Sequence, residues 1–139
     1  MEDTPKIYKT SKMITEDYIS FETAKLLKEK GFDVYVSSFY DDEGKFSTKV
    51  ADWNWNIGLR YSAPTLQMAI KWLREVYKIE IWVQYDIDKT TWWGGCNPMY
   101  EEDEENSSMF QSLLGFDYPG KTYEEAAEAA IKYCLENLI

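Results

Sequence analysis

Three segments of the chain have apolar residues at the three- and four-residue spacing of an amphipathic helix. They cover residues 20–30, 62–78 and 122–139. Ser20 is a favoured N-cap residue for the first segment, and Gly31 supplies the left-handed residue that ends many helices. Thr122 and Glu125 form a capping box at the start of the third. We therefore predict three helices, the last of which ends at the C-terminus.

Alternation of apolar and polar residues predicts strands between these helices. It occurs over residues 34–39, 45–51 and 79–88. The turn at 41–44 lies between the first two runs and predicts a hairpin. In the third run the odd positions are apolar and the even ones polar, except for Trp82.

Two further stretches are less regular. Trp53, Trp55 and Ile57 lie on one side of their segment, which fits either a third strand or an aromatic loop. We expect residues 89–108 to be irregular, with Gly94-Gly95 and Cys96 in a turn, and residues 109–116 to return to strand structure.

These elements predict an α+β fold with three helices packed on a mainly antiparallel sheet. We expect an N-terminal arm over residues 1–14 and a single domain over 15–139. The segments Lys25–Glu29 and Lys71–Glu75 resemble each other, and each is followed shortly by a strand. Two αββ units and a C-terminal helix would explain this repetition, although helix and strand patterns alone also produce it.

The formal net charge of −10 disfavours binding to nucleic acids and to anionic membranes. It suits a basic protein partner, and it also serves simply to keep an aromatic-rich domain soluble. The N-terminal residues lack the apolar run of a signal peptide, and no stretch approaches the ~20 apolar residues of a membrane span. We expect a cytoplasmic protein.

The residue inventory argues against several kinds of catalysis. The chain has no histidine, which excludes Ser/His/Asp and Cys/His nucleophilic sites and most zinc enzymes. Asp86 and Asp88 share one strand face, but a solvated strand edge explains them better than a catalytic carboxylate pair does. The acidic run 101–105 lacks the spacing and the glycine of an EF-hand loop. We therefore expect no catalytic site, no metal and no cofactor.

The aromatic share of 17% is high for a domain of this size. Five tryptophans lie at strand or loop positions where a ligand could reach them: Trp53, Trp55, Trp82, Trp92 and Trp93. Exposed aromatic rings anchor protein interfaces and stack on sugars. The alternative is that helices bury Trp82 and that the other rings fix a long loop. We take the five as candidate binding residues.

The helix segments also resemble a group of proteins. Ser20–Phe32, Ala63–Thr65 with Lys71–Glu75, and Thr122–Ile139 are similar to segments of small uncharacterised proteins encoded in gut-bacterial genomes, prophages and mobile elements. The resemblance implies a bacterial or phage-related setting. It carries over no catalytic residues, because the group has no established activity.

These observations favour a non-enzymatic protein-interaction or binding module, and they are compatible with a homodimer. The alternatives are an acidic mimic of nucleic acid, and a carbohydrate-binding or carboxylate-only hydrolytic domain. Exposure of the five tryptophans is the structural feature that best separates a binding surface from a buried aromatic core.

Overall fold

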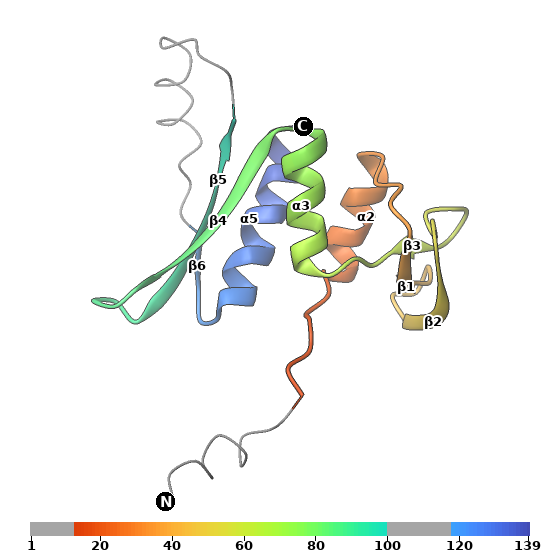
Figure 1. Ribbon diagram of the computed structural model, residues 1–139, viewed down its shortest axis with the longest axis horizontal. Coiled ribbons are helices and arrows are strands. Elements are labelled where there is room, and N and C mark those ends of the chain that lie inside the picture. The colour runs from red at the N-terminus through yellow and green to blue at the C-terminus, as the bar shows by residue number, and fades with distance from the viewer. Residues whose placement is uncertain (1–12, 100–117) are drawn as a thin grey trace, which may run out of the picture.

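The computed structural model describes residues 13–99 and 118–139, which contain three helices and six strands (Figure 1). The helices are α2 (Phe21–Glu29), α3 (Leu66–Val76) and α5 (Tyr123–Asn137). The strands are β1 (Val36–Tyr40), β2 (Phe46–Trp53), β3 (Tyr61–Ser62), β4 (Ile79–Asp86), β5 (Thr91–Pro98) and β6 (Tyr118–Gly120). All strand pairs are antiparallel, so the predicted α+β class is confirmed.

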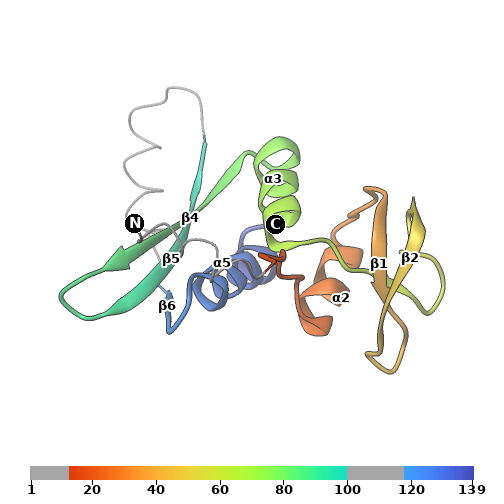
Figure 2. The same cartoon turned by 60° about the horizontal axis from the view of Figure 1, so that its bottom comes forward.

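The strands form two sheets, whereas the sequence pattern predicts one. Their orders are β2-β1-β3 and β4-β5-β6. Helix α3 follows the two-residue strand β3 and carries the chain from the first sheet to the second. The helices lie between the two sheets, and α5 covers one face of the β4–β5–β6 sheet (Figures 1 and 2).

The expected αββ order occurs twice, and each hairpin is followed by a further strand. The two units nevertheless differ in topology. The first strand after the helix is central in the β2-β1-β3 sheet, whereas β4 lies at the edge of its sheet. A similar order of elements therefore leads to two different strand arrangements.

The helix ends follow their sequence signals. Ser20 and Thr122 are the N-caps of α2 and α5, and their hydroxyls accept from the backbone N–H groups of Thr23 and Glu125 at 3.2 and 3.1 Å. Gly31 has a φ of 90°, as the end of α2 requires. Helix α3 begins later than expected, because Thr65 is its N-cap.

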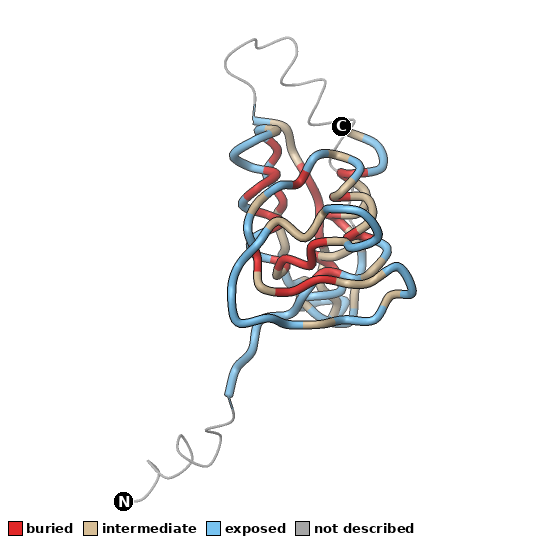
Figure 3. Tube along the Cα trace, turned by 90° about the vertical axis from the view of Figure 1, so that its right-hand side faces the viewer, coloured by how far each residue is buried: buried red, intermediate tan, exposed pale blue. Residues whose placement is uncertain are grey.

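The core lies where the helices meet the sheets (Figure 3). Gly94 in β5 allows α5 to pack closely on this strand, because a Cβ at this position would overlap the carbonyl oxygen of Ala126. The expectation of an irregular segment is therefore wrong for residues 91–98, which form a strand of eight cross-strand pairs with β4. Cys96 is fully buried in that strand and does not lie in an exposed turn. Residues 100–108 and the predicted strand at 109–116 lie outside the described residues.

Most of the predicted arm, residues 1–12, also lies outside the described part of the chain, and Met13 and Ile14 are exposed. Over residues 13–99 and 118–139, no helix combines the length and the apolar character needed to cross a membrane.

Candidate binding surfaces

The five candidate tryptophans lie in three places. Trp53 is exposed, and the other four are partly buried, so none is fully enclosed in the core. The structure brings Trp53 and Trp55 together beside the first sheet, and Trp82 and Trp93 together on the second. Trp92 lies apart from both pairs. The five therefore do not form one continuous patch.

The first group belongs to a surface around the loop that follows β2. Trp53, Trp55, Ile57, Leu59 and Arg60 line a hollow of about 400 Å³ together with Asn54, and we call these five residues the loop surface. Trp53, Ile57 and Leu59 are 49%, 60% and 67% exposed. Three large apolar side chains thus face water around a single hollow.

The backbone of this loop is fixed by side-chain amides and hydroxyls. Asn56 donates to the carbonyl of Phe32 at 2.7 Å, and its amide oxygen accepts from the N–H of Ser62 at 2.7 Å. The hydroxyl of Ser62 accepts from the N–H of Trp55 at 3.0 Å. Asn54 accepts from the N–H of Asn56 at 3.1 Å. These bonds join the loop to both the β-sheet and the end of α2.

Hydrogen bonds also hold Trp55 and the C-terminal part of the loop, at Gly58 and Arg60. The indole N–H of Trp55 donates to the carbonyl of Val36 at 2.7 Å, which fixes its ring against β1. The ammonium group of Lys28, on α2, donates to the carbonyl oxygens of Gly58 and Arg60. The exposed side chains of Ile57 and Leu59 are therefore carried by an ordered backbone.

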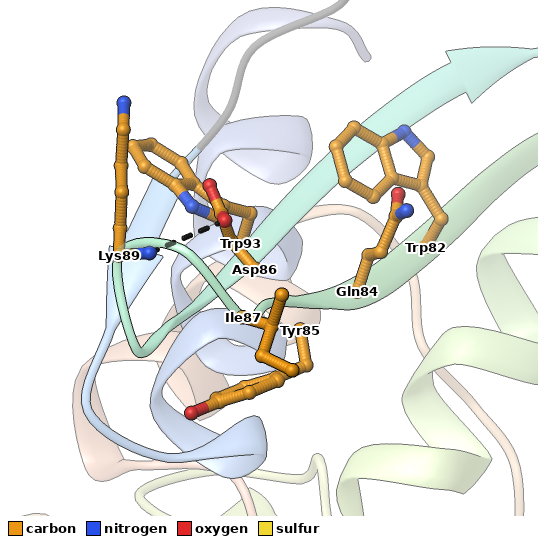
Figure 4. Close-up of a pocket in the computed structure, with 7 residues that line it drawn as sticks. All are labelled: Trp82, Gln84, Tyr85, Asp86, Ile87, Lys89 and Trp93. Carbon is orange, nitrogen blue, oxygen red and sulfur yellow. Dashed lines mark hydrogen bonds between the residues drawn. The ribbon is translucent and has the colours of Figure 1, made fainter.

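The second group lies on the β4–β5 hairpin, as Figure 4 shows. A hollow of about 440 Å³ is lined by Trp82, Gln84, Tyr85, Asp86, Ile87, Lys89 and Trp93, and we call it the sheet hollow. Trp82 is opposite Gly95 and Trp93 is opposite Gln84, which places the two tryptophans on the same face of the sheet. No helix in the described residues packs on that face (Figures 1 and 2).

Contacts within the hairpin fix two charged side chains of the sheet hollow, Asp86 and Lys89. Asp86 accepts from the backbone N–H groups of Asp88 and Lys89 at 3.0 and 3.3 Å, which closes the hairpin turn. The ammonium group of Lys89 lies 5.6 Å from the ring centroid of Trp93. The indole N–H of Trp93 is buried and has no hydrogen-bond partner among the described residues.

Trp92 lies on the opposite face of β5, against α5. Its ring is 5.0 Å from that of Tyr85 and 5.7 Å from that of Tyr123, measured between centroids. These contacts fix the start of α5 on the hairpin. The structure therefore gives Trp92 a packing environment different from that of the two surfaces.

In the part of the chain that the structure describes, the carboxylates and thiols do not assemble into a reactive group. Asp86 lines the sheet hollow, whereas Asp88 contributes a backbone N–H to the turn. Burial raises the pKa of Cys96 to about 11 and that of Cys134 to about 12, which favours the unreactive thiol form. Within the described ranges no cluster of three Cys, Asp or Glu side chains could hold a metal. The acidic run 101–105 lies outside those ranges.

Sequence reasoning notes Ile57 but misses Leu59 and Arg60 as members of a surface. The residue types are ordinary, and alternation around Trp53 and Trp55 also fits a strand. The available signal is the pair of aliphatic residues on either side of Gly58, in a segment with two asparagines. That composition favours a turn, in which aliphatic side chains have no sheet to pack on.

No family model, no curated protein and no solved structure matches this chain.

Proposed function

We propose that this protein is a non-enzymatic protein-interaction module and that the loop surface is its contact site. The observation that supports this most directly is the exposure of Trp53, Ile57 and Leu59 around one hollow. Apolar side chains that gather in one exposed patch mark interaction sites more often than singly scattered ones do. Tryptophan and arginine, both present here, are enriched among the residues that dominate binding energies at interfaces.

The order of the loop supports the same proposal. A flexible segment that binds a partner loses conformational entropy, whereas a segment already held in its bound shape loses less. The hydrogen bonds of Asn56, Ser62 and Lys28 hold the loop in one arrangement before any partner arrives. The exposed aliphatic side chains therefore offer a rigid contact area.

The double substitution Ile57→Ser with Leu59→Ser tests the proposal. Val76→Ser is the matched control, because Val76 is also an exposed aliphatic residue but lies on α3, outside both surfaces. Each protein is used as bait in an extract of its native host, and the recovered proteins are quantified by mass spectrometry. We expect at least one protein that the unaltered chain and Val76→Ser retain and the double variant loses. Identical recovery by all three would exclude the loop surface as the contact site.

A second candidate function is carbohydrate binding in the sheet hollow. The observation in its favour is that Trp82 and Trp93 lie in one hollow with the amide of Gln84 and the carboxylate of Asp86. Aromatic rings stack on sugar rings, while amides and carboxylates bond their hydroxyl groups. Titration with monosaccharides and short oligosaccharides would then change the tryptophan fluorescence, and Trp93→Ala would remove the change. The double variant of the loop surface would keep it.

The resemblance of the helix segments to small proteins of gut bacteria and their prophages suggests where to look for a partner. We propose that the partner is a protein of such a host or phage and that the two meet in the cytoplasm. Extracts of gut bacteria are therefore the first material for the binding experiment.

A further inference from the structure

Arg60 is the charged member of the loop surface, and its guanidinium group is held by aromatic rings. Its Cζ atom lies 4.8 Å from the ring centroid of Phe39 and 5.7 Å from that of Trp55. The ring centroids of Phe39 and Trp55 lie 4.7 Å apart, so the two rings contact the guanidinium group together. A guanidinium stacked in this way keeps its planar edge available for hydrogen bonding.

That edge has no acceptor among the described residues. Within residues 13–99 and 118–139, no carboxylate lies within ion-pair distance of Arg60, and no side-chain hydrogen bond has its guanidinium as donor. This is unexpected on electrostatic grounds, because the chain has 25 acidic and only 15 basic residues. Asp52, which is near in sequence, lines a different and smaller hollow with Tyr35 and Met68.

Two other cations contact aromatic rings near Arg60. The ammonium of Lys28 lies 4.7 Å from the ring centroid of Tyr61, and that of Lys49 lies 6.0 Å from that of Phe39. Three cations therefore gather on the aromatic rings beside the apolar hollow. Attraction between unlike charges favours an acidic ligand at this site, whatever the net charge of the domain.

We propose that Arg60 binds the carboxylate of an Asp or Glu side chain in an acidic, apolar segment of a partner protein. The apolar residue next to that carboxylate enters the hollow between Trp53, Ile57 and Leu59. The inference rests on the proposed function and specifies its partner. It differs from the expectation drawn from net charge, which favours a basic partner.

The chemistry of the two neighbouring groups selects this ligand. An arginine edge offers two parallel N–H donors that match the two oxygens of a carboxylate. The hollow beside it excludes water once an apolar side chain fills it, and this strengthens the ion pair. A phosphate backbone would meet the same arginine, but the remaining acidic surface repels it and leaves the apolar side chains without partners.

Selection of peptides on the full-length protein tests the proposal. A library of random linear peptides is selected on the unaltered chain, and enriched sequences are synthesised with a fluorescent label and an amidated C-terminus. Their dissociation constants are measured by fluorescence anisotropy for the unaltered chain, Arg60→Gln, Arg60→Lys and Arg74→Gln. Arg74→Gln is the matched control, because Arg74 is the second of two arginines in the chain and is exposed on α3.

We expect enriched peptides to carry Asp or Glu next to a large apolar residue. Arg60→Gln weakens their binding by about tenfold or more, since it removes one partner of a desolvated charge pair. Arg60→Lys keeps the charge without the planar edge and weakens binding less. Arg74→Gln leaves it unchanged. Urea unfolding of each variant shows whether the fold is retained.

The outcomes separate this inference from the function on which it rests. If peptides bind in a manner that requires Ile57 and Leu59 but not Arg60, or if basic peptides are enriched, the inference is wrong and the interaction module stands. If the double substitution of Ile57 and Leu59 does not weaken the binding of any peptide, both the inference and the proposed function are wrong. Self-association in sedimentation velocity that Arg60→Gln abolishes would also overturn the inference, because the occupant would be a second copy of the chain.

Discussion

The carboxylate of Glu128, on α5, accepts a hydrogen bond of 2.6 Å from the hydroxyl of Ser20, the N-cap residue of α2. It also accepts from the backbone N–H of Ser20 and from the hydroxyl of Thr23. A negative charge beside the first turn of a helix is favourable, because the helix dipole and the free N–H groups are positive there. One side chain thus joins two helices that are far apart in the sequence.

Replacement of Glu128 should loosen this junction. Glu128→Gln keeps the shape of the side chain but removes its charge and half of its accepting capacity. We expect a loss of about 1–2 kcal/mol in the free energy of unfolding, which is part of the ~1.5–3 kcal/mol that hydrogen bonds to a charged group contribute, because the glutamine still accepts. Urea unfolding followed by circular dichroism measures the change. Glu136→Gln, an exposed substitution on the same helix, should change the stability by less than about 0.5 kcal/mol. Equal effects of the two variants would show that the Glu128 contacts contribute nothing.

The contact between α5 and β5 gives a second prediction. Gly94→Ala places a methyl group against the backbone of Ala126, which cannot move without shifting α5. We expect a loss of about 3 kcal/mol or more, near the upper end for overpacked cores. The thermal midpoint measures it. Gly31→Asn is the control, because nothing lies within 4 Å of a Cβ at that position and asparagine tolerates a positive φ. A midpoint for Gly94→Ala above that of the control would contradict the packing argument.

The helices could be predicted because their signals are local. The residues Ser20, Gly31 and Thr122 form caps that depend on only a few neighbours in the sequence. The division of the strands between two sheets depends on contacts between distant segments, which periodicity does not report. Strand β5 could not be predicted for a related reason: Gly94 weakens a strand pattern, and its role depends on the close approach of Ala126.

The candidate surfaces could also be predicted only in part from the sequence. Aromatic residues are conspicuous in a sequence, so Trp53, Trp55, Trp82 and Trp93 could be selected as binding candidates before the fold was known. Which of them lie together follows from strand pairing, and alternation within one strand cannot give it. Arg60 could not be selected, because its distinguishing features are two ring contacts and the lack of an acceptor among the described residues.

The two cysteines give a prediction for reactivity and for pH. Both are free and fully buried, and burial raises the pKa of Cys96 to about 11 and that of Cys134 to about 12. In the folded protein at pH 8 we expect neither thiol to react with an aromatic disulfide reagent, and both to react after unfolding in urea. Absorbance of the released thiolate measures the reaction. Rapid modification of one thiol without denaturant would show that it is accessible.

The same thiols should also make stability depend on pH in the alkaline range. An unfolded thiol ionises at its ordinary pKa of about 9, whereas the folded one retains its proton. Stability linked to these groups is therefore complete below pH 9 and falls as the pH rises toward 11, because the unfolded state alone loses protons. Cys96→Ala with Cys134→Ala should flatten this dependence, as measured by urea unfolding at pH 8 and pH 10. An unchanged slope in the double variant would assign the dependence to other groups.

Two neighbouring asparagines test whether the loop surface depends on its internal hydrogen bonds. The side-chain amide of Asn56 both donates and accepts a hydrogen bond, whereas the side chain of Asn54 accepts one, from the N–H of Asn56. Asn56→Asp therefore replaces a donor with an oxygen that faces the carbonyl of Phe32, while Asn54→Asp preserves the bond that is present. At pH 7 we expect Asn56→Asp to lose about 2 kcal/mol, because a partly buried acceptor then lacks its donor, and Asn54→Asp to change by less than about 0.5 kcal/mol. Urea unfolding measures both, and hydrogen exchange of residues 54–60 shows whether the loop has loosened. If the two variants behave alike, the Asn56 amide does not hold the loop, and the rigid presentation of Ile57 and Leu59 has to come from packing alone.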